Sequence, residues 1–209
     1  MEGLHETFHL TYVLLLTTAT ITIIEALRTA DPMVRHILNL ETCISIVAGY
    51  FYSVFIEKIK GPYTWPELTK VRYLDWAITT PIMLLALCLA LTYNVGQSLR
   101  LSLILTIVAL NYMMLSVGFL GEINSLPRLE ASLIGFIPFF VMFWLIYSLV
   151  GNSLANKVLV GFYFVVWSGY GLVYLLDEES KQFATNILDL IAKCLIGLGL
   201  WAYYTKILH

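Results

Sequence analysis

Charged residues inside two apolar stretches of the chain are the ones whose types and spacing could do chemistry. Asp189 and Lys193 are four residues apart, so a helix would stack them on one face, about 6 Å from each other. Arg72, Asp75 and Thr79 follow at intervals of three and four residues, again on one helical face. A charge at the centre of a bilayer costs about 2.5–3.5 kcal/mol on insertion scales, so each requires a reason to be there.

Two interpretations of these charges are open. In the first, Asp189 and Lys193 only neutralise each other inside a helix bundle, as in a transporter or a structural ion pair. In the second, Lys193 is a desolvated amine that condenses with an aldehyde to form a Schiff base. Once protonated, that Schiff base is a buried cation and needs carboxylate counterions, which Asp75 and Asp189 would supply from two different helices.

Composition identifies the class of protein in which these charges are placed. The chain has 209 residues, of which 59% are hydrophobic and 12% are charged, and its mean hydropathy is +0.82. Soluble domains carry about 25% charged residues, so this chain has too little polar surface to remain in solution. The net charge of −2 argues against a nucleic-acid partner. We therefore predict an integral, multi-pass membrane protein surrounded by lipid.

The three cysteines, Cys43, Cys88 and Cys194, all fall within apolar stretches. They have neither the spacing of metal ligands nor the loop positions typical of extracellular disulfides. We interpret them as small hydrophobic residues of the core, and we expect no metal site.

Seven segments are apolar and long enough to cross a bilayer, which requires about 20 residues as a helix. They cover residues 8–27, 37–56, 73–92, 99–120, 129–150, 158–176 and 183–207, and short connectors carry the turn residues and most of the charges. The predicted fold class is therefore all-α, a seven-transmembrane-helix bundle with short loops, as one domain over residues 1–209. Basic residues are divided evenly between the two ends, so charge alone does not set the topology.

Two of the charged motifs resemble signatures of the microbial (type 1) rhodopsins. The string RYLDWAITTPIMLL at 72–85 resembles their third-helix signature, and LDLIAK at 188–193 resembles their retinal-attachment motif. The segment WSGY at 167–170 is similar to the aromatic pair that encloses the polyene. The resemblance covers all seven segments in order. Other features are similar to the rhodopsins of giant viruses of protists, namely the tight loops, Glu25 with Arg28, Glu41 and Trp201.

The resemblance implies a cofactor and a role for individual residues. Lys193 would hold all-trans retinal as a Schiff base, with Asp75 as the primary proton acceptor and Asp189 as the second counterion. Arg72 would be the gate arginine, and Tyr50 would hydrogen-bond to Asp189. The pocket would be lined by Trp76, Thr80, Met83, Gly118, Phe139, Trp167, Tyr170 and Ala192. Ordinary helix packing is the alternative explanation for the aromatic residues and for the glycine.

Four positions depart from the pattern of the family's pumps. Ala86 is eleven residues after Asp75, about 16 Å along the helix, where pumps commonly carry an acidic proton donor. Gly171 replaces a proline that usually kinks the sixth helix. Lys181 occupies the place of an outer release carboxylate in some pumps, and Asn111 the place of an acid in some members.

The resemblance implies a light-responsive retinal protein that is not an enzyme, and we predict an outward light-driven proton pump. Because of Ala86, the returning proton would come through Glu41 or directly from water, so we expect slow turnover. Glu178 or Glu179 would assist release, unless they form an ordinary solvated loop. The alternatives are a light-gated cation channel, and a photosensor that acts through a partner. Retinal, lipid and further copies of the chain in a homo-oligomer are the expected partners.

Overall fold

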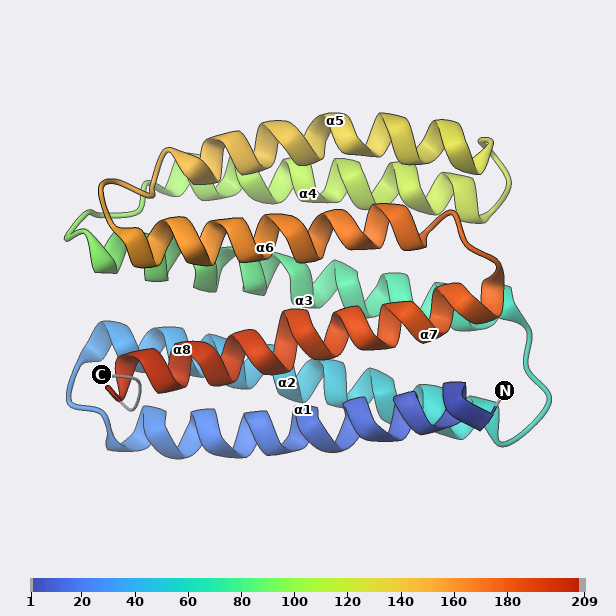
Figure 1. Ribbon diagram of the computed structural model, residues 1–209, viewed down its shortest axis with the longest axis horizontal. Coiled ribbons are helices and arrows are strands. Elements are labelled where there is room, and N and C mark those ends of the chain that lie inside the picture. Colours follow the sequence, from blue (N-terminus) through green and yellow to red (C-terminus); the bar gives the residue numbers. More distant parts are fainter. Residues whose placement is uncertain (1, 207–209) are drawn as a thin grey trace.

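Seven helical rods run side by side along the long axis of the molecule and are joined by short connections at its two ends (Figure 1). This computed structural model describes residues 2–206, so residue 207, the predicted end of the last segment, lies outside the described residues. The helices are α1 (Glu2–Arg28), α2 (Pro32–Ile59), α3 (Trp65–Asn94), α4 (Leu101–Glu122), α5 (Arg128–Tyr147) and α6 (Leu154–Val173). The seventh rod consists of α7 (Glu178–Asp189), a π-helical segment (Leu190–Leu195) and α8 (Ile196–Tyr204). The predicted all-α, seven-helix fold is confirmed.

The helices have the length and composition of membrane spans. Within the described residues, six rods are long and apolar enough to cross a bilayer, and α6 is the remaining one. Its first turn contains the polar residues Asn156 and Lys157, which lower its mean hydropathy. Large apolar side chains such as Trp144 and Val165, which are 73% and 69% exposed, face outward, where lipid would cover them. The protein is an integral, multi-pass membrane protein.

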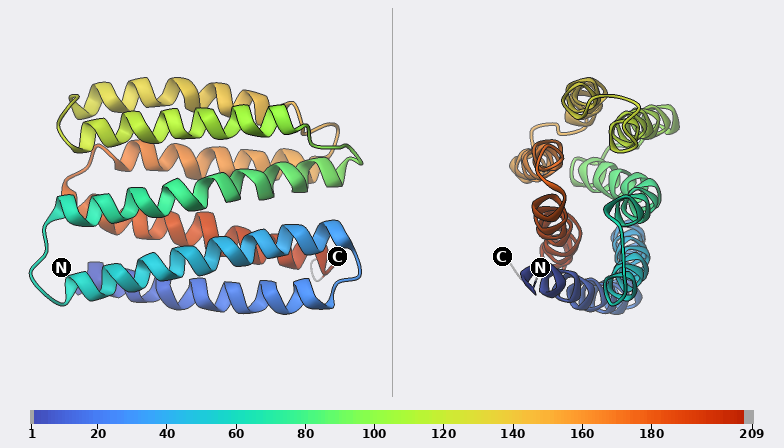
Figure 2. Two further views of the ribbon diagram at one scale, coloured as in Figure 1. Left: turned by 180° about the vertical axis from the view of Figure 1, so that it is seen from behind. Right: turned by 90° about the vertical axis from the view of Figure 1, so that its right-hand side faces the viewer.

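Seen from one end, the rods enclose an elongated interior (Figure 2). Helices α2 and α3 form one long side, α6 and the seventh rod form the other, and α1 and the α4–α5 pair close the two short sides. The interior divides into two halves along the bundle. The Arg72 half lies toward the N-terminus and the α2–α3, α4–α5 and α6–α7 connections, and the Glu41 half lies toward the opposite end.

The end of the Glu41 half shows how local sequence starts a helix. Asp31 precedes α2, and its Oδ1 accepts hydrogen bonds from the backbone N–H groups of Met33 and Val34 at 2.8 and 3.1 Å. Pro32 occupies the first helical position, where its missing N–H costs no hydrogen bond. Tyr93, near the end of α3, donates its hydroxyl proton to Asp31 Oδ2 at 2.6 Å. This hydrogen bond lowers the pKa of the Asp31 carboxyl below its ordinary value.

The cysteines separate into two environments. Cys88 and Cys194 are buried, as predicted, but Cys43 is exposed on α2. The prediction of a core position is wrong for Cys43 because its neighbour Thr42 occupies the buried face, and one residue along a helix turns the side chain by about 100°. At this position Cys43 faces outward as a small apolar side chain.

Candidate functional site

Four charged side chains meet in the middle of the bundle. Asp75 and Asp189 are fully buried, and Arg72 and Lys193 are at most 2% exposed. Lys193 Nζ donates a hydrogen bond to Asp75 Oδ2 at 2.6 Å and lies 3.6 Å from Asp189 Oδ1. Arg72 Nη1 lies 3.1 Å from Asp189 Oδ2. The two cations balance the two carboxylates, which reduces the large cost of burying charge.

The seventh rod presents Lys193 through an irregular backbone. The α-helix ends at Asp189, and the π-helical segment carries Lys193 near its middle. A π-helical turn contains more backbone per turn than an α-helix and is common at functional sites. The sequence predicted a regular helical stack of Asp189 and Lys193. The structure keeps them close and also brings the amine of Lys193 to Asp75 on α3, on the opposite side of the interior.

The two buried carboxylates differ sharply in their hydrogen bonds. Asp189 Oδ2 accepts from Tyr52 at 2.9 Å and from Arg72 at 3.1 Å, while its Oδ1 accepts from Tyr170 at 2.7 Å. The indole N–H of Trp76 adds a longer contact of 3.4 Å to Oδ1. Hydrogen bonds of this kind favour the charged form of a carboxylate. Asp189 is therefore built to remain ionised.

Asp75 has a simpler environment. Its Oδ2 accepts from Lys193, and its Oδ1 accepts from Thr79 Oγ1 at 3.3 Å. Arg72 and Asp75 share a helical face, but among the described residues Arg72 forms its ion pair with Asp189, across the interior. Asp75 therefore depends on the amine of Lys193 for its charge balance more than Asp189 does.

The tyrosine that contacts Asp189 was assigned to the wrong position. Tyr52 donates the hydrogen bond, whereas Tyr50 is 65% exposed on the outer face of α2. Two residues along a helix rotate the side chain by about 200°, which moves it to the opposite face. A signal was available in the sequence, because Tyr52 follows the buried polar residues Glu41 and Ser45 at intervals that keep all three on one helical face.

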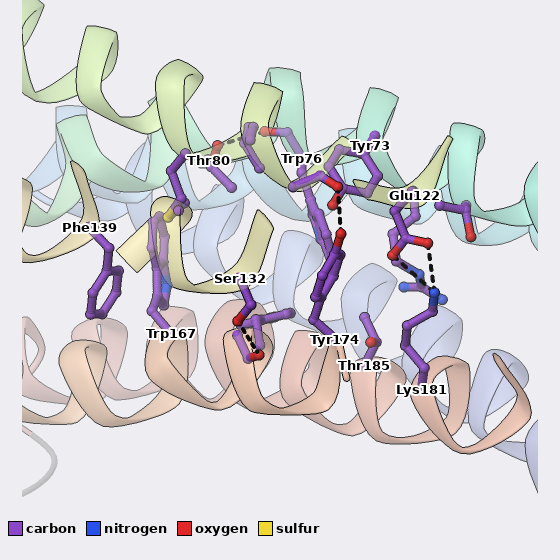
Figure 3. A pocket seen from close by; sticks show the side chains of 18 of the residues that line it. Tyr73, Trp76, Thr80, Glu122, Ser132, Phe139, Trp167, Tyr174, Lys181 and Thr185 are labelled. Carbon is purple, nitrogen blue, oxygen red and sulfur yellow. Dashed lines mark hydrogen bonds and ion pairs between the residues drawn. The ribbon is translucent and has the colours of Figure 1, made fainter. Parts of the chain in front are cut away.

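An elongated cavity runs beside the charge cluster (Figure 3). Phe139 and Trp167 lie at one end of it, and Glu122 and Lys181 lie at the other. Its lining includes Lys193, Asp189 and Arg72 together with seven predicted pocket residues: Trp76, Thr80, Met83, Gly118, Phe139, Trp167 and Tyr170. Ala192 is buried in the apolar core next to Lys193 and is not among the lining residues. An apolar, aromatic-walled cavity with a buried amine on its wall fits an apolar aldehyde such as retinal.

Glycines keep the walls of this cavity close together. A Cβ atom at Gly171 would lie 2.5 Å from Phe136 Cζ, so the residue that replaces the family's proline makes room for an aromatic ring. A Cβ atom at Gly118 would lie 2.7 Å from the Tyr73 hydroxyl. Outside the lining, a Cβ atom at Gly121 would lie 2.7 Å from Ala131 Cβ, which shows how closely α4 packs on α5 beside the cavity.

The end of the cavity in the Arg72 half carries an ion cluster that sequence reasoning missed. Lys181 Nζ lies 2.8 Å from Glu122 Oε2 and 3.0 Å from Glu178 Oε2. Arg128 pairs with the same two carboxylates. Glu178 is therefore part of an ion-pair network at the end of the cavity and not a freely solvated loop residue. Glu122 and Lys181 are 59 residues apart, and no local spacing pointed to their contact.

The Glu41 half has a different character. Ala86, at the position of the expected donor, is fully buried among leucines. Glu41 is 1% exposed, and its Oε1 has no hydrogen-bond partner in the described part of the chain. Its other oxygen lies beside Gly197, where a Cβ atom would be 3.2 Å away. Asn111 donates to Thr80 Oγ1 at 2.8 Å and thus fixes a threonine of the cavity wall.

Comparison with known proteins gives consistent matches. A family model described as bacteriorhodopsin-like protein matches residues 3–207. The solved structure of the viral rhodopsin OLPVRII is 43% identical, with a TM-score of 0.94 and 98% of each chain covered. Sensory rhodopsin I of Haloarcula marismortui is 30% identical over 179 residues, which cover 76% of this chain and 72% of that protein. The blue-light absorbing proteorhodopsin of Gamma-proteobacterium Hot 75m4 is 29% identical over 158 residues, 66% of this chain and 62% of that protein, so the match spans less than two thirds of that relative.

Proposed function

Because the chain belongs to the bacteriorhodopsin-like family of light-driven ion pumps and sensors, we propose that it is an outward light-driven proton pump whose proton is replaced slowly. Membership of this family confirms the resemblance drawn from the two charged motifs. It also makes the chain a retinal protein, with the cofactor on Lys193, and not an enzyme. The family contains both pumps and sensors. Our proposal goes beyond family membership in three respects: the chain is a pump, its ion is the proton, and transport is outward.

The observation that carries the proposal is the 2.6 Å hydrogen bond from Lys193 Nζ to Asp75. A proton pump needs an acceptor within hydrogen-bond reach of the nitrogen that loses the proton, either directly or through one water molecule. A pump for chloride would need room for the anion beside the same cation, and the Asp75 carboxylate occupies that place. The free amine of Lys193 stands here for the nitrogen that carries the cofactor.

Retinal bound to Lys193 supplies the absorption of light and a change of shape that alters the position and basicity of this nitrogen. The residues of the chain do the rest. Asp75 takes up the proton at Oδ2, while Thr79 holds Oδ1 and orients the carboxylate. Asp189, kept ionised by Arg72, Tyr52 and Tyr170, retains the negative charge that balances Arg72 while Asp75 holds the proton.

The return of the proton limits the rate in this proposal. Ala86 has no group that can donate, and Glu41 is the buried carboxyl group on the same side of Lys193. Apolar residues such as Leu84 and Leu87 line this half of α3, so a proton from Glu41 or from bulk water has a long path to the nitrogen. We therefore expect slow turnover.

A homo-oligomer also stays a prediction. The molecular mass of the protein in detergent would test it.

Transport assays test the proposal directly. In illuminated cells, the medium should become acidic, and a protonophore should abolish this acidification. The acidification should not depend on chloride. Asp75→Asn should lose the signal, while Glu57→Gln, at an exposed position on α2, should keep it. Voltage-clamp currents that reverse with the cation gradient would identify a channel instead. A pigment that is photoactive but moves no ion would favour a sensor.

A further inference from the structure

The guanidinium group of Arg72 has all of its N–H groups engaged. Nε and Nη2 both donate to Gln182 Oε1, at 3.0 and 2.8 Å, and Nη2 also donates to Asn186 Oδ1 at 2.8 Å. Nη1 donates to Asp189 at 3.1 Å and to the Tyr52 hydroxyl at 3.4 Å. The ring of Phe55 lies 4.7 Å from the guanidinium carbon. Arg72 is therefore held along three successive turns of the seventh rod.

Asn186 is the centre of this arrangement, and it also connects the arginine to α1. Its Nδ2 donates to Thr7 Oγ1 at 2.9 Å, and its backbone carbonyl accepts from Thr11 Oγ1 at 3.3 Å. The same carbonyl and that of Ile187 share the N–H of Leu190, where the α-helix changes into the π-helical segment. One fully buried residue thus links the arginine, the first helix and the backbone that presents Lys193.

We infer that Asn186, supported by Gln182, is a positioning residue that fixes the Arg72 charge at Asp189 and keeps it from moving toward the Arg72 end of the bundle. Space for such a movement exists, since Arg72, Gln182 and Glu122 line the same cavity. In the opposite direction Asp189 and Lys193 already occupy the interior. Without Asn186, the guanidinium loses one of the contacts that hold it against Asp189 and is free to swing along the cavity toward the Arg72 end.

This movement has a measurable effect on Asp75. The charged groups that act on Asp75 are Lys193 and Asp189 on the seventh rod and Arg72 on α3, and the hydroxyls of Tyr52 on α2 and Tyr170 on α6 contact Asp189. Arg72 is the member of this set that can move away while the others stay. Arg72 and Asp75 are three residues apart on one face of α3, so the positive charge favours the ionised carboxylate, and its withdrawal should let Asp75 accept a proton at higher pH.

The experiment is an acid titration of the colour of the retinal-bound protein. In the wild type, acid should cause a red shift as Asp75 is protonated. In Asn186→Leu, which keeps the volume and removes the amide, the red shift should begin about one pH unit higher. Gln182→Met should act in the same direction. Thr7→Val, which leaves Asn186 Oδ1 free to hold Arg72 but removes the support from α1, should give a smaller shift.

The matched control is Thr22→Val. Thr22 is equally buried and hydrogen-bonds to Thr42 at 2.7 Å, but it lies in the Glu41 half, away from Arg72. An equal shift in Thr22→Val and Asn186→Leu would mean general loosening and would overturn the inference, as would unchanged titrations in both Asn186→Leu and Gln182→Met. If Asn186→Leu does not bind retinal, Gln182→Met and Thr7→Val decide the question.

The inference rests on Asp75 as the acceptor, and the titration separates the two failures. If Asp75→Asn still shows the acid red shift, the proposed function is wrong at its acceptor. If Asp75→Asn loses the red shift while the Asn186 and Gln182 variants titrate like the wild type, the pump proposal stands and the positioning role fails.

Discussion

The two halves of the bundle interior differ in how completely their central polar groups are paired. In the Arg72 half, the arginine uses all of its N–H groups and the Glu122–Lys181 pair is closed at 2.8 Å. In the Glu41 half, Glu41 Oε1 and Ser45 Oγ are buried without a hydrogen-bond partner in the part of the chain that the structure describes. A buried unpaired polar group costs about 1–3 kcal/mol. One half is therefore a fixed electrostatic frame, and in the proposed pump the other half is where hydrogen-bond partners change as a proton passes.

Lys193 marks the boundary between the halves, and its removal should have the largest effect. Lys193→Ala should give a protein without visible colour after retinal is added, because the bond to the cofactor cannot form. Absorption spectroscopy of the purified protein measures this. The control is Lys181→Met, since Lys181 is the other lysine of the cavity lining and should not be needed for colour. Visible colour retained by Lys193→Ala would contradict the attachment site.

The second prediction tests whether the Glu41 half supplies the returning proton. In flash photolysis between about pH 5 and 9, recovery of the protonated pigment should slow as pH rises, because no fast donor replaces Ala86. Glu41→Gln should slow recovery by about 10²-fold if Glu41 donates. Ala86→Asp should accelerate it, if water reaches the new carboxyl group. Fast, pH-independent recovery that survives Glu41→Gln would remove the functional contrast between the halves.

The fold and part of the charge cluster could be predicted from the sequence alone. The fold followed from hydropathy and segment length, which each segment carries locally. The cluster of Asp75, Asp189 and Lys193 was predictable because charge within an apolar segment needs a function. The contacts within the cluster depend on how each helix is rotated about its axis, which the sequence alone does not determine. For this reason Tyr50 was predicted to contact Asp189, whereas Tyr52 makes this contact.

The contacts of polar residues that have many possible partners were not predicted from the sequence. Gln182 and Asn186 are neutral, and their sequence positions do not indicate that an arginine from α3 lies against them. Glu122 stands at the end of a helix, where acids are ordinary, and its contact with Lys181 depends on how α4 and α7 meet. The π-helical segment has no composition that distinguishes it from the α-helix on either side.

A third prediction uses colour to test the apolar side of the boundary. Met83 is 3% exposed and lines the cavity, where an apolar side chain places no strong dipole near the polyene. The wild-type pigment should absorb green light. Met83→Gln should shift absorption toward the blue, and Met83→Leu should leave it nearly unchanged. A wild-type pigment that absorbs blue light at neutral pH would contradict the assignment of Met83.

The smallest effect is expected at the end of the Glu41 half. Asp31→Ala should lower the free energy of unfolding by about 1 kcal/mol, because α2 loses its N-cap. Since the folded pKa of Asp31 lies below its ordinary value, its contribution is complete above that ordinary value and declines as pH falls through the folded pKa. Denaturation in detergent at neutral and acidic pH measures this. Tyr93→Phe keeps the cap and should lose less, and an effect equal to that of Asp31→Ala would assign the stabilisation to the hydroxyl instead.

The glycines beside the cavity affect how the sequence can change over time. Gly121 and Gly171 carry no charge, donate no proton and touch no reacting atom, yet an added methyl group at either position would collide with Ala131 or with Phe136. In a saturation mutagenesis library scored by pigment formation, Gly121, which faces the Cβ atom of Ala131, should be less tolerant than Gly171, which faces the tip of the Phe136 ring. A larger residue at Gly171 therefore requires the Phe136 ring to turn or a smaller residue to replace it, which couples these two facing positions.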